Sequence, residues 1–219
     1  FLKNGSPKIF HEKARMVIAC DGASSRLRRD ILKSPSNNII TYQTFCKGSI
    51  DLDYGYFHAF LDQQFSQYDA WFNVKVDYMI MGVGVKDASL MRHYHSKFVS
   101  YLKSHYHARI SPFEREEVDL MPYITPEFQV NLGKGRVLFA GDAAHLLNPM
   151  GEGISSALAS GSAAAEAITT ELGSESDMNS ENVLNRYESN LKGEIEYMIR
   201  QWKFLSTISP EFRNFHRIK

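Results

Sequence analysis

The chain has 219 residues, of which 43% are hydrophobic, and this is enough apolar material for the core of one large domain or two small ones. The 25 basic and 25 acidic side chains cancel, so the charge argues against a nucleic-acid-binding protein. Two cysteines exclude a disulfide framework and favour a reducing, cytoplasmic compartment, and no apolar run is long enough to span a bilayer.

Hydrophobic periodicity, β-branched and aromatic residues, and turn residues predict the elements in chain order. We expect strands 8–13 and 16–20, helix 26–32, strands 39–45, 54–61, 71–76 and 78–85, helix 88–106, strands 116–123 and 137–140, and helices 153–172 and 181–205. Strand–turn–helix units thus flank a mostly antiparallel middle. This order predicts an α/β (α+β) fold in which both ends of the chain build one part and the middle forms an inserted sheet.

The most informative stretch is GRVLFAGDAAHLLNPMGEGISSALASG, at residues 135–161. An apolar strand ends in Gly141-Asp142, which places a carboxylate at the carboxyl edge of a sheet, where open α/β folds bind ligands and where it can accept hydrogen bonds from a sugar hydroxyl. The helix that starts near Gly153 directs unpaired N–H groups and a partial positive charge at a ligand. On spacing alone, an ordinary strand–loop–helix unit packed through Gly and Ala explains the pattern equally well.

Two segments resemble motifs of a known family. Residues 135–144, continued by residues 149–154 and 157–161, resemble the second flavin-contacting motif of FAD-dependent monooxygenases and reductases of the para-hydroxybenzoate hydroxylase fold. Residues 17–28, VIACDGASSRLR, resemble the Asp-Gly motif of the same family. The two motifs stand in the family's order and are separated by an insert of suitable length.

The geranylgeranyl reductase-like branch of this family is most similar. Residues 151–161 resemble its Gly-Glu-Gly-Ile and Ala-Leu-x-Ser-Gly run. Residues 68–75, YDAWFNVK, followed by residues 82–85, GVGV, look like its substrate-domain segment, although Val74 stands where that branch usually has proline. This departure makes the substrate inference weaker than the flavin inference.

The resemblance implies the later part of an FAD-binding Rossmann-like domain, at residues 1–33 and 127–219, and a substrate-binding β-sheet domain at residues 34–126. It implies that Asp142 binds the ribityl chain of FAD, and that backbone N–H groups near Gly153 and Ile154 favour the reduced, anionic flavin ring. The full set of implied cofactor residues is Asp142, Gly141, Ala143, Pro149, Gly151, Glu152, Gly153, Ile154, Asp21 and Arg28. The last two would organise the cofactor groove and help a nicotinamide donor, NAD(P)H, to dock.

The family's Gly-x-Gly-x-x-Gly turn, which seats the pyrophosphate, is not found in the sequence. Residues 82–84 are a lookalike with Asp87 at the third position, and residues 151–153 have Ser156 there. The first residue is not methionine either, and Asn4-Gly5 indicates a turn. We therefore expect a fragment that binds FAD weakly or not at all, with the function belonging to a longer parent protein.

Candidate substrate residues are Trp71, Lys75 and His145. His145 either sits near the flavin or is a loop histidine bonded to backbone. Further aromatic residues either line an apolar substrate tunnel or form the sheet core, namely Tyr56, Phe57, Phe60 and Phe72. Alternation along a strand requires about half of them to be core in either case.

No metal site is expected. The four clustered histidines are His93, His95, His105 and His107. Residues two apart on a helix point to different faces, so neither His-x-His pair chelates a metal well. Cys20 is expected to be buried as a small apolar residue, and Cys46 to be a strand residue.

The resemblance implies an FAD-dependent oxidoreductase that reduces isoprenoid double bonds by hydride transfer from reduced flavin. A flavin-dependent hydroxylase and a non-catalytic binding domain that has lost the cofactor are the alternatives. The expected partner is a small apolar substrate. The apolar, basic C-terminal region either packs as a helix or contacts a membrane surface peripherally.

Overall fold

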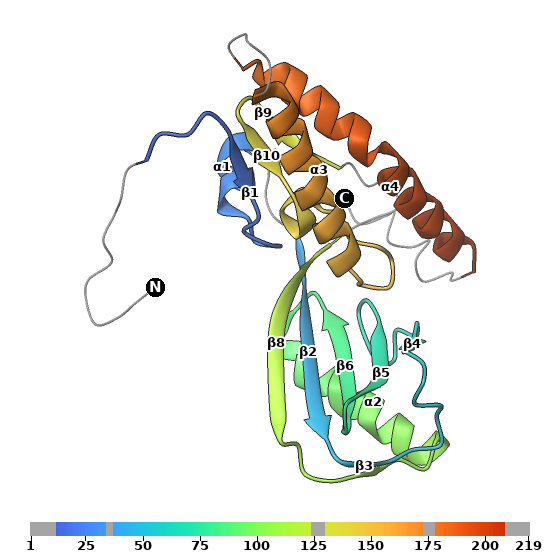
Figure 1. The fold of residues 1–219 in the computed structure, drawn as a ribbon. Helices are drawn as coiled ribbons and strands as arrows, with labels where there is room; N and C mark the ends of the chain where they lie inside the picture. The colour runs from blue at the N-terminus through green and yellow to red at the C-terminus, as the bar shows by residue number, and fades with distance from the viewer. Residues whose placement is uncertain (1–11, 34–36, 124–129, 173–177, 209–219) are drawn as a thin grey trace, which may run out of the picture.

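The computed structural model describes residues 12–33, 37–123, 130–172 and 178–208. The described residues form two parts, one above the other in Figure 1. Each part consists of a sheet with its helices, and we call the two parts the upper and the lower layer. The upper layer contains β1 (Val17–Ala19), α1 (Arg26–Leu32), β9 (Gly133–Lys134), β10 (Val137–Phe139), the 3-10 helix η2 (Gly141–Ala144), α3 (Ile154–Leu172) and α4 (Ser180–Ile208). The lower layer contains β2 (Asn38–Cys46), β3 (Gly48–Ser49), β4 (His58–Phe60), β5 (Ala70–Lys75), β6 (Tyr78–Val85), η1 (Ala88–Leu90), α2 (Met91–His105), β7 (Arg109–Ile110) and β8 (Arg115–Pro122).

The upper layer is built on a three-stranded sheet of order β1-β10-β9. β1 and β10 are parallel, with Val17 opposite Val137 and Ala19 opposite Phe139. Helices α3 and α4 pack on this sheet, and the buried Tyr187 hydroxyl of α4 donates a hydrogen bond to the Phe139 carbonyl at 2.8 Å. The alanine-rich sequence of α3 keeps that helix slim, and its Ala163, Ala164 and Ala167 are buried in one core cluster with Phe139 and Tyr187.

Helix α1 follows β1 directly because its first turn is capped twice. The Ser25 hydroxyl accepts a hydrogen bond from the Arg28 N–H at 3.0 Å, and the Asp21 carboxylate accepts one from the Arg26 N–H at 3.0 Å. Capping by both side chains satisfies donors that a helix leaves unpaired at its start. The helix ends at Lys33, which adopts the left-handed conformation.

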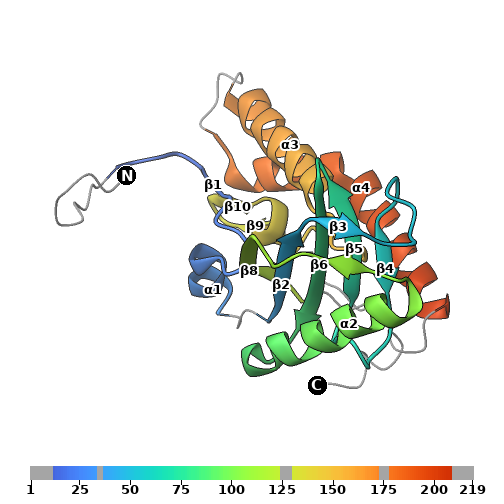
Figure 2. The same ribbon diagram turned by 90° about the horizontal axis from the view of Figure 1, so that it is seen from below.

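The lower layer is a five-stranded antiparallel sheet of order β4-β5-β6-β2-β8. Helix α2 covers one face, as the view from below shows (Figure 2). Phe98 and Leu102 of α2 are fully buried against Phe72 and Met81 of the sheet. The residues that alternate with this core point to the opposite face of the sheet, which is the face that forms part of the site.

The predicted α/β fold with a mostly antiparallel middle is confirmed. The expected helix 26–32 and strand 78–85 match α1 and β6. Strand 54–61 is shorter than expected, because only β4 pairs with a neighbour, and the two-residue strands β3, β7 and β9 were not predicted. Residues 12 and 13 are not in a strand, and the rest of the expected strand 8–13, like the Asn4-Gly5 turn, lies outside the described residues.

The two cysteines differ in their surroundings. Cys46 is buried in β2, as expected. The expectation that Cys20 is buried was wrong, because this residue follows the end of β1 and is exposed at the cavity described below. In the described part of the chain, no helix is both long enough and apolar enough to cross a membrane.

The glycines of the 82–84 lookalike serve the lower sheet. A Cβ on Gly82 would overlap the ring of Trp71, which lies across it on β5. A Cβ on Gly84 would lie 3.1 Å from Asp69 Oδ1. These two glycines therefore leave room for the side chains of Trp71 and Asp69 above β6.

Replacing Gly82 with alanine should lower the free energy of unfolding by about 1–3 kcal/mol, because the Trp71 ring has to leave its position. Chemical denaturation measures this. Gly193→Ala is the matched control, since a Cβ on that helical glycine would meet no neighbouring group within 4 Å and alanine there should stabilise by roughly 0.5–1 kcal/mol. Equal stability of Gly82→Ala and the unaltered protein would contradict the close approach of Trp71.

Candidate cofactor and substrate site

A cavity of about 520 Å³, which we call the upper cavity, lies where β1 and β10 end. Its walls come from segments that are far apart in the sequence. They are Cys20, Gly22, Thr41, Asp119, Leu120, Met121, Ala140, Gly141, Asp142, Leu147, Gly151, Gly153, Ile154 and Ala157. The parallel pairing of β1 and β10 brings the two strand ends, and with them the two glycine-containing turns, to one edge of the sheet.

Asp142 is the acidic residue of the upper cavity that lies in η2, just beyond the end of β10. Burial raises the pKa of its carboxyl group, and the negative charge of Asp119 raises it further. Its side chain accepts no hydrogen bond from the residues that the structure describes, and a Cβ on Gly153 would lie 3.1 Å from Oδ1. A carboxylate that is partly removed from water and lacks a donor is suited to bind the hydroxyl groups of a ligand.

The loop before α3 is held by its own side chains. Asn148 Oδ1 accepts hydrogen bonds from the N–H groups of Met150 and Glu152, both at 3.0 Å. Glu152 Oε1 in turn accepts one from the Ser155 N–H at 2.9 Å. Among the described residues, the N–H groups of Gly153 and Ile154 make no hydrogen bond. They remain available at the positive end of a 19-residue helix, beside the upper cavity.

The segments that form the wall of the upper cavity pack closely against one another at two glycines. A Cβ on Gly141 would come within 3.1 Å of Ala157, and one on Gly153 within 3.0 Å of Leu147. These residues, with the unpartnered Asp142 and the helix N-terminus, fit the sugar and ring portion of FAD. Among the described residues, no Lys or Arg lines the cavity, so the phosphates of FAD would have to be bound elsewhere.

The structure brings together half of the cofactor residues implied by the sequence. Gly141, Asp142, Gly151, Gly153 and Ile154 line the upper cavity. The other five do not line it. Asp21 caps α1 and Glu152 caps α3, and the side chains of Arg28, Ala143 and Pro149 are buried.

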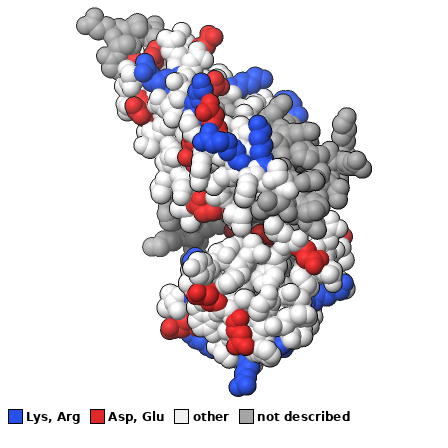
Figure 3. Space-filling model, turned by 90° about the vertical axis from the view of Figure 1, so that its right-hand side faces the viewer, with Lys and Arg blue, Asp and Glu red and all other residues white. Residues whose placement is uncertain are grey.

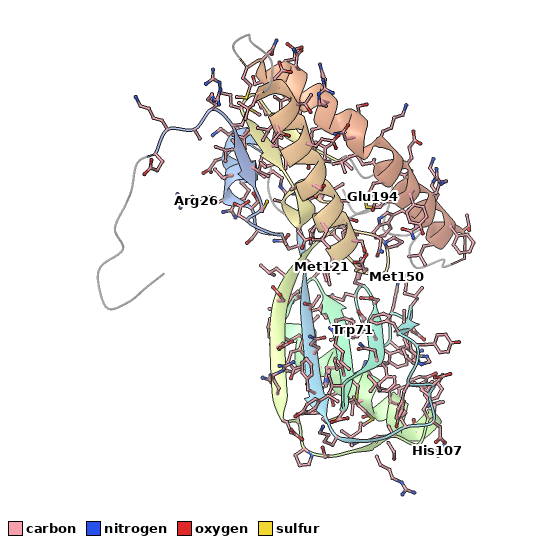
Figure 4. All side chains as sticks on the ribbon, in the orientation of Figure 1. Arg26, Trp71, His107, Met121, Met150 and Glu194 are labelled. Atoms are coloured by element: carbon pink, nitrogen blue, oxygen red, sulfur yellow. The ribbon has the colours of Figure 1, made fainter. Side chains whose placement is uncertain are left out.

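A second cavity of about 470 Å³, the lower cavity, adjoins the first and shares with it Thr41, Asp119, Met121 and Gly151. Its other walls are Gln43, Phe57, Asp69, Trp71, Glu117, Val118 and Met150. Met121 and Met150 lie at the junction of the two layers, with Trp71 below them (Figure 4). A ligand in the lower cavity would therefore lie next to whatever occupies the upper one.

The floor of the lower cavity consists of two rows of residues that cross the sheet. One row is Trp71, Gly82, Gln43 and Glu117, which are successive cross-strand neighbours. The other is Asp69, Gly84, Thr41 and Asp119, in which the Gly84 N–H donates to the Asp69 carbonyl at 2.8 Å. Each row begins with Trp71 or Asp69, which lies beside a glycine of β6. Each row ends with an acidic residue of β8.

Asp69 is the functional candidate that the sequence did not reveal. Its residue is only 6% exposed, and Oδ1 has no hydrogen-bond partner among the described residues. Burial raises the pKa of its carboxyl group to about 7. A buried, unpartnered acid in a cavity is a common feature of functional sites.

The other sequence candidates lie elsewhere. Lys75 is exposed at the far end of β5 from Ala70, so it does not line either cavity with Trp71. His145 is half-buried in the left-handed conformation after η2, with Nε2 unpartnered in the described structure. Of the aromatic residues, Phe57 lines the lower cavity, whereas Phe72 and Phe60 pack in the core beneath α2.

The four clustered histidines serve separate contacts. His95 is buried against Thr44 and the Met81 carbonyl, and burial lowers its pKa to about 4. His107 pairs with Asp51 at 2.8 Å at the opposite end of the lower layer from Met121 (Figure 4). Within the described ranges, no three His, Cys, Asp or Glu side chains come together as a metal site.

The two layers are arranged as in several solved structures, among them flavin-dependent enzymes. A geranylgeranyl bacteriochlorophyll reductase-like protein from Thermoplasma acidophilum has a TM-score of 0.70, with 20% identity over 90% of this chain and 51% of its own. PqsL, a probable FAD-dependent monooxygenase from Pseudomonas aeruginosa, has a TM-score of 0.56, with 19% identity over 92% of this chain and 58% of its own. CmlS, a flavin-dependent halogenase, has a TM-score of 0.58, with 17% identity over 93% of this chain and 40% of its own.

These likenesses show the fold. The chain spans about half the length of the first two structures. No family model and no curated protein matches the chain.

Asp69→Asn should stabilise the protein in a pH-dependent way. The folded-state pKa of about 7 lies above the reference value of 3.8, so between these values the unfolded chain loses a proton that the folded protein keeps. Asp69 therefore costs stability increasingly from pH 4 to 7, and the gain from the Asp69→Asn substitution should reach a value on the order of 3 kcal/mol at pH 8.

Denaturant unfolding at pH 4.5 and at pH 8 tests this. Asp77→Asn is the control, because Asp77 is an exposed aspartate in the turn between β5 and β6. A gain for Asp69→Asn that does not increase with pH would show that the carboxyl group is not held in the buried, unpartnered state.

Ser160→Ala should lower the free energy of unfolding by about 1–3 kcal/mol. The fully buried Ser160 hydroxyl accepts a hydrogen bond from the Gly141 N–H at 2.9 Å and thus holds the turn that carries Asp142. Ser162→Ala, at an exposed position of α3, should change stability by less than about 0.5 kcal/mol. Identical unfolding midpoints for the two variants would rule out this role of Ser160.

Proposed function

We propose that this chain is the later part of an FAD-dependent oxidoreductase that acts on a small molecule in the lower cavity. The observation that carries the proposal is the pair of adjoining cavities, one with an unpartnered acid facing a helix N-terminus and one with polar and aromatic walls. In this proposal residues 1–33 and 127–219 belong to the FAD-binding domain, and residues 34–126 form the substrate domain.

The residues of the upper cavity would divide the work of holding the cofactor. Asp142 would accept hydrogen bonds from the ribityl hydroxyls, and the N–H groups of Gly153 and Ile154 would stabilise negative charge on the ring. Bound FAD would supply the hydride or oxygen chemistry that the side chains themselves lack. Gly141 and Ala157 would keep the wall flat, and the loop at Met150 and Gly151 would separate the ring from the lower cavity.

Reduction of an isoprenoid double bond is the first candidate reaction, with NAD(P)H as a candidate source of electrons. The T. acidophilum structure is described as reductase-like, and Met121, Met150, Phe57 and Trp71 give the lower cavity apolar walls that suit a prenyl chain. Hydride transfer to such a bond needs a substrate held beside the ring and protected from water.

Flavin-dependent hydroxylation is the second candidate. The observation that favours it is the polar floor of the lower cavity, because an entirely apolar substrate would cover Asp69 while its Oδ1 has no hydrogen-bond partner among the described residues. Oxygen consumption in step with product formation would identify a hydroxylase, whereas a prenyl reductase would work anaerobically.

Asp142→Ala should abolish flavin retention in the protein at its full natural length, because the variant loses the carboxylate that would bind the ribityl chain. We expect at least a roughly tenfold weaker FAD affinity, measured by flavin absorbance after desalting and by titration with added FAD. Asp30→Ala is the control, since Asp30 is exposed on α1 and away from both cavities.

Retention of flavin by Asp142→Ala at the level of the control would contradict the cofactor assignment. A full-length protein that is colourless and takes up no added FAD would favour the remaining alternative, a binding domain that keeps the fold without the cofactor.

A further inference from the structure

We propose that the lower cavity recognises a positively charged nitrogen on the substrate, and that Asp69 is the residue that binds it. This inference rests on the proposed function, because it names the chemical class of the molecule that would lie beside the flavin. The ligand is thus an organic ammonium compound with an apolar body, and it places its nitrogen at the floor of the cavity.

The first argument is the charge of the cavity. Three of the residues that line it carry carboxylates, Asp69, Glu117 and Asp119, and none of the described lining residues is Lys, Arg or His. Such a wall repels carboxylate and phosphate groups and attracts cations. On the face shown in Figure 3, Lys and Arg side chains lie over the upper layer and around the margin of the lower layer.

The second argument distinguishes Asp69 from the other two acids. Glu117 is already paired, because it lies 3.2 Å from Arg115 Nε and accepts a hydrogen bond from Gln43 at 2.7 Å. Asp119 is exposed and accepts a hydrogen bond from the Leu120 N–H at 2.8 Å. Asp69 has an unpartnered oxygen, is only 6% exposed, and forms no ion pair in the described structure. It is the acid of the cavity that has a buried oxygen without a hydrogen-bond partner among the described residues.

The third argument comes from the aromatic residues beside Asp69. Trp71 and Phe57 line the same cavity, and their rings can stabilise a cation as well as an apolar body. Trp71 is held in place above Gly82, so its ring is preorganised. A carboxylate flanked by aromatic rings is a suitable site for an ammonium group, and Met121 and Met150 leave apolar surface for the remainder of the ligand.

The test uses 2-phenylethylamine and its uncharged analogue 2-phenylethanol as probes, titrated calorimetrically into this chain at pH 8 without flavin. We expect the amine to bind at least roughly tenfold more tightly than the alcohol. Asp69→Asn should remove most of this preference, whereas Asp77→Asn, at an exposed turn of the same sheet, should leave it unchanged. Asp69→Asn is expected to fold, because its carboxyl group makes no hydrogen bond through Oδ1 that the variant would lose.

The pH dependence of amine binding distinguishes direct binding by Asp69 from a purely structural role of this residue. Binding of the amine should weaken as the pH falls from 8 to 6, because the Asp69 carboxyl takes up a proton around pH 7. The titratable groups that face Asp69 are Tyr68 beside it and Glu117 and Asp119 across the cavity. Asp69→Asn should lose this pH dependence.

Equal affinity for the amine and the alcohol, or an amine preference that persists in Asp69→Asn, would overturn the proposal. This failure is distinguishable from failure of the proposed function, because flavin binding depends on Asp142 and is measured separately. A protein that retains FAD but shows no amine preference would remain a flavoprotein with a different substrate class.

Discussion

The parallel pairing of β1 with β10 is the contact on which the rest of the structure depends. It joins residues 17–19 to residues 137–139, so the chain between them must leave the upper sheet and return to the same edge. The first and last long strands of that excursion, β2 and β8, are neighbours in the lower sheet. For this reason Thr41 and Asp119, which face each other on these strands, line both cavities.

The sequence predicts the elements that are long and periodic, and it misses features that arise from pairing between strands. Helix α1 and strand β6 were predicted to the residue, whereas β3, β7 and β9 are too short to show a period. Asp142 could be predicted because a Gly-Asp pair ends an apolar strand. Asp69 could not, because its role comes from its position beside Gly84, on another strand.

Lys75 is a residue that the sequence predicted for the site and that the structure places outside it. Trp71 and Lys75 both belong to the segment 68–75 that resembles a substrate-domain segment, and positions 71 and 75 lie on one face of a strand by alternation. They are nevertheless separated by four residues along β5, about 13 Å, and the cavity ends before Lys75 is reached. Alternation in the sequence predicts which face of the sheet a residue lies on. Only the cavity in the structure shows which residues along that face belong to the site.

The two acids with raised pKa values differ in what compensates them. Asp142 lies near the N-terminus of α3, where the partial positive charge of the helix offsets part of its negative charge. Asp69 lies on the opposite side of the junction, directly before β5 and beside a sheet, which supplies no comparable dipole. The ionised form of Asp69 therefore depends more strongly on a positive charge from outside the chain. This difference favours a cationic group in the lower cavity and neutral hydroxyl groups in the upper cavity.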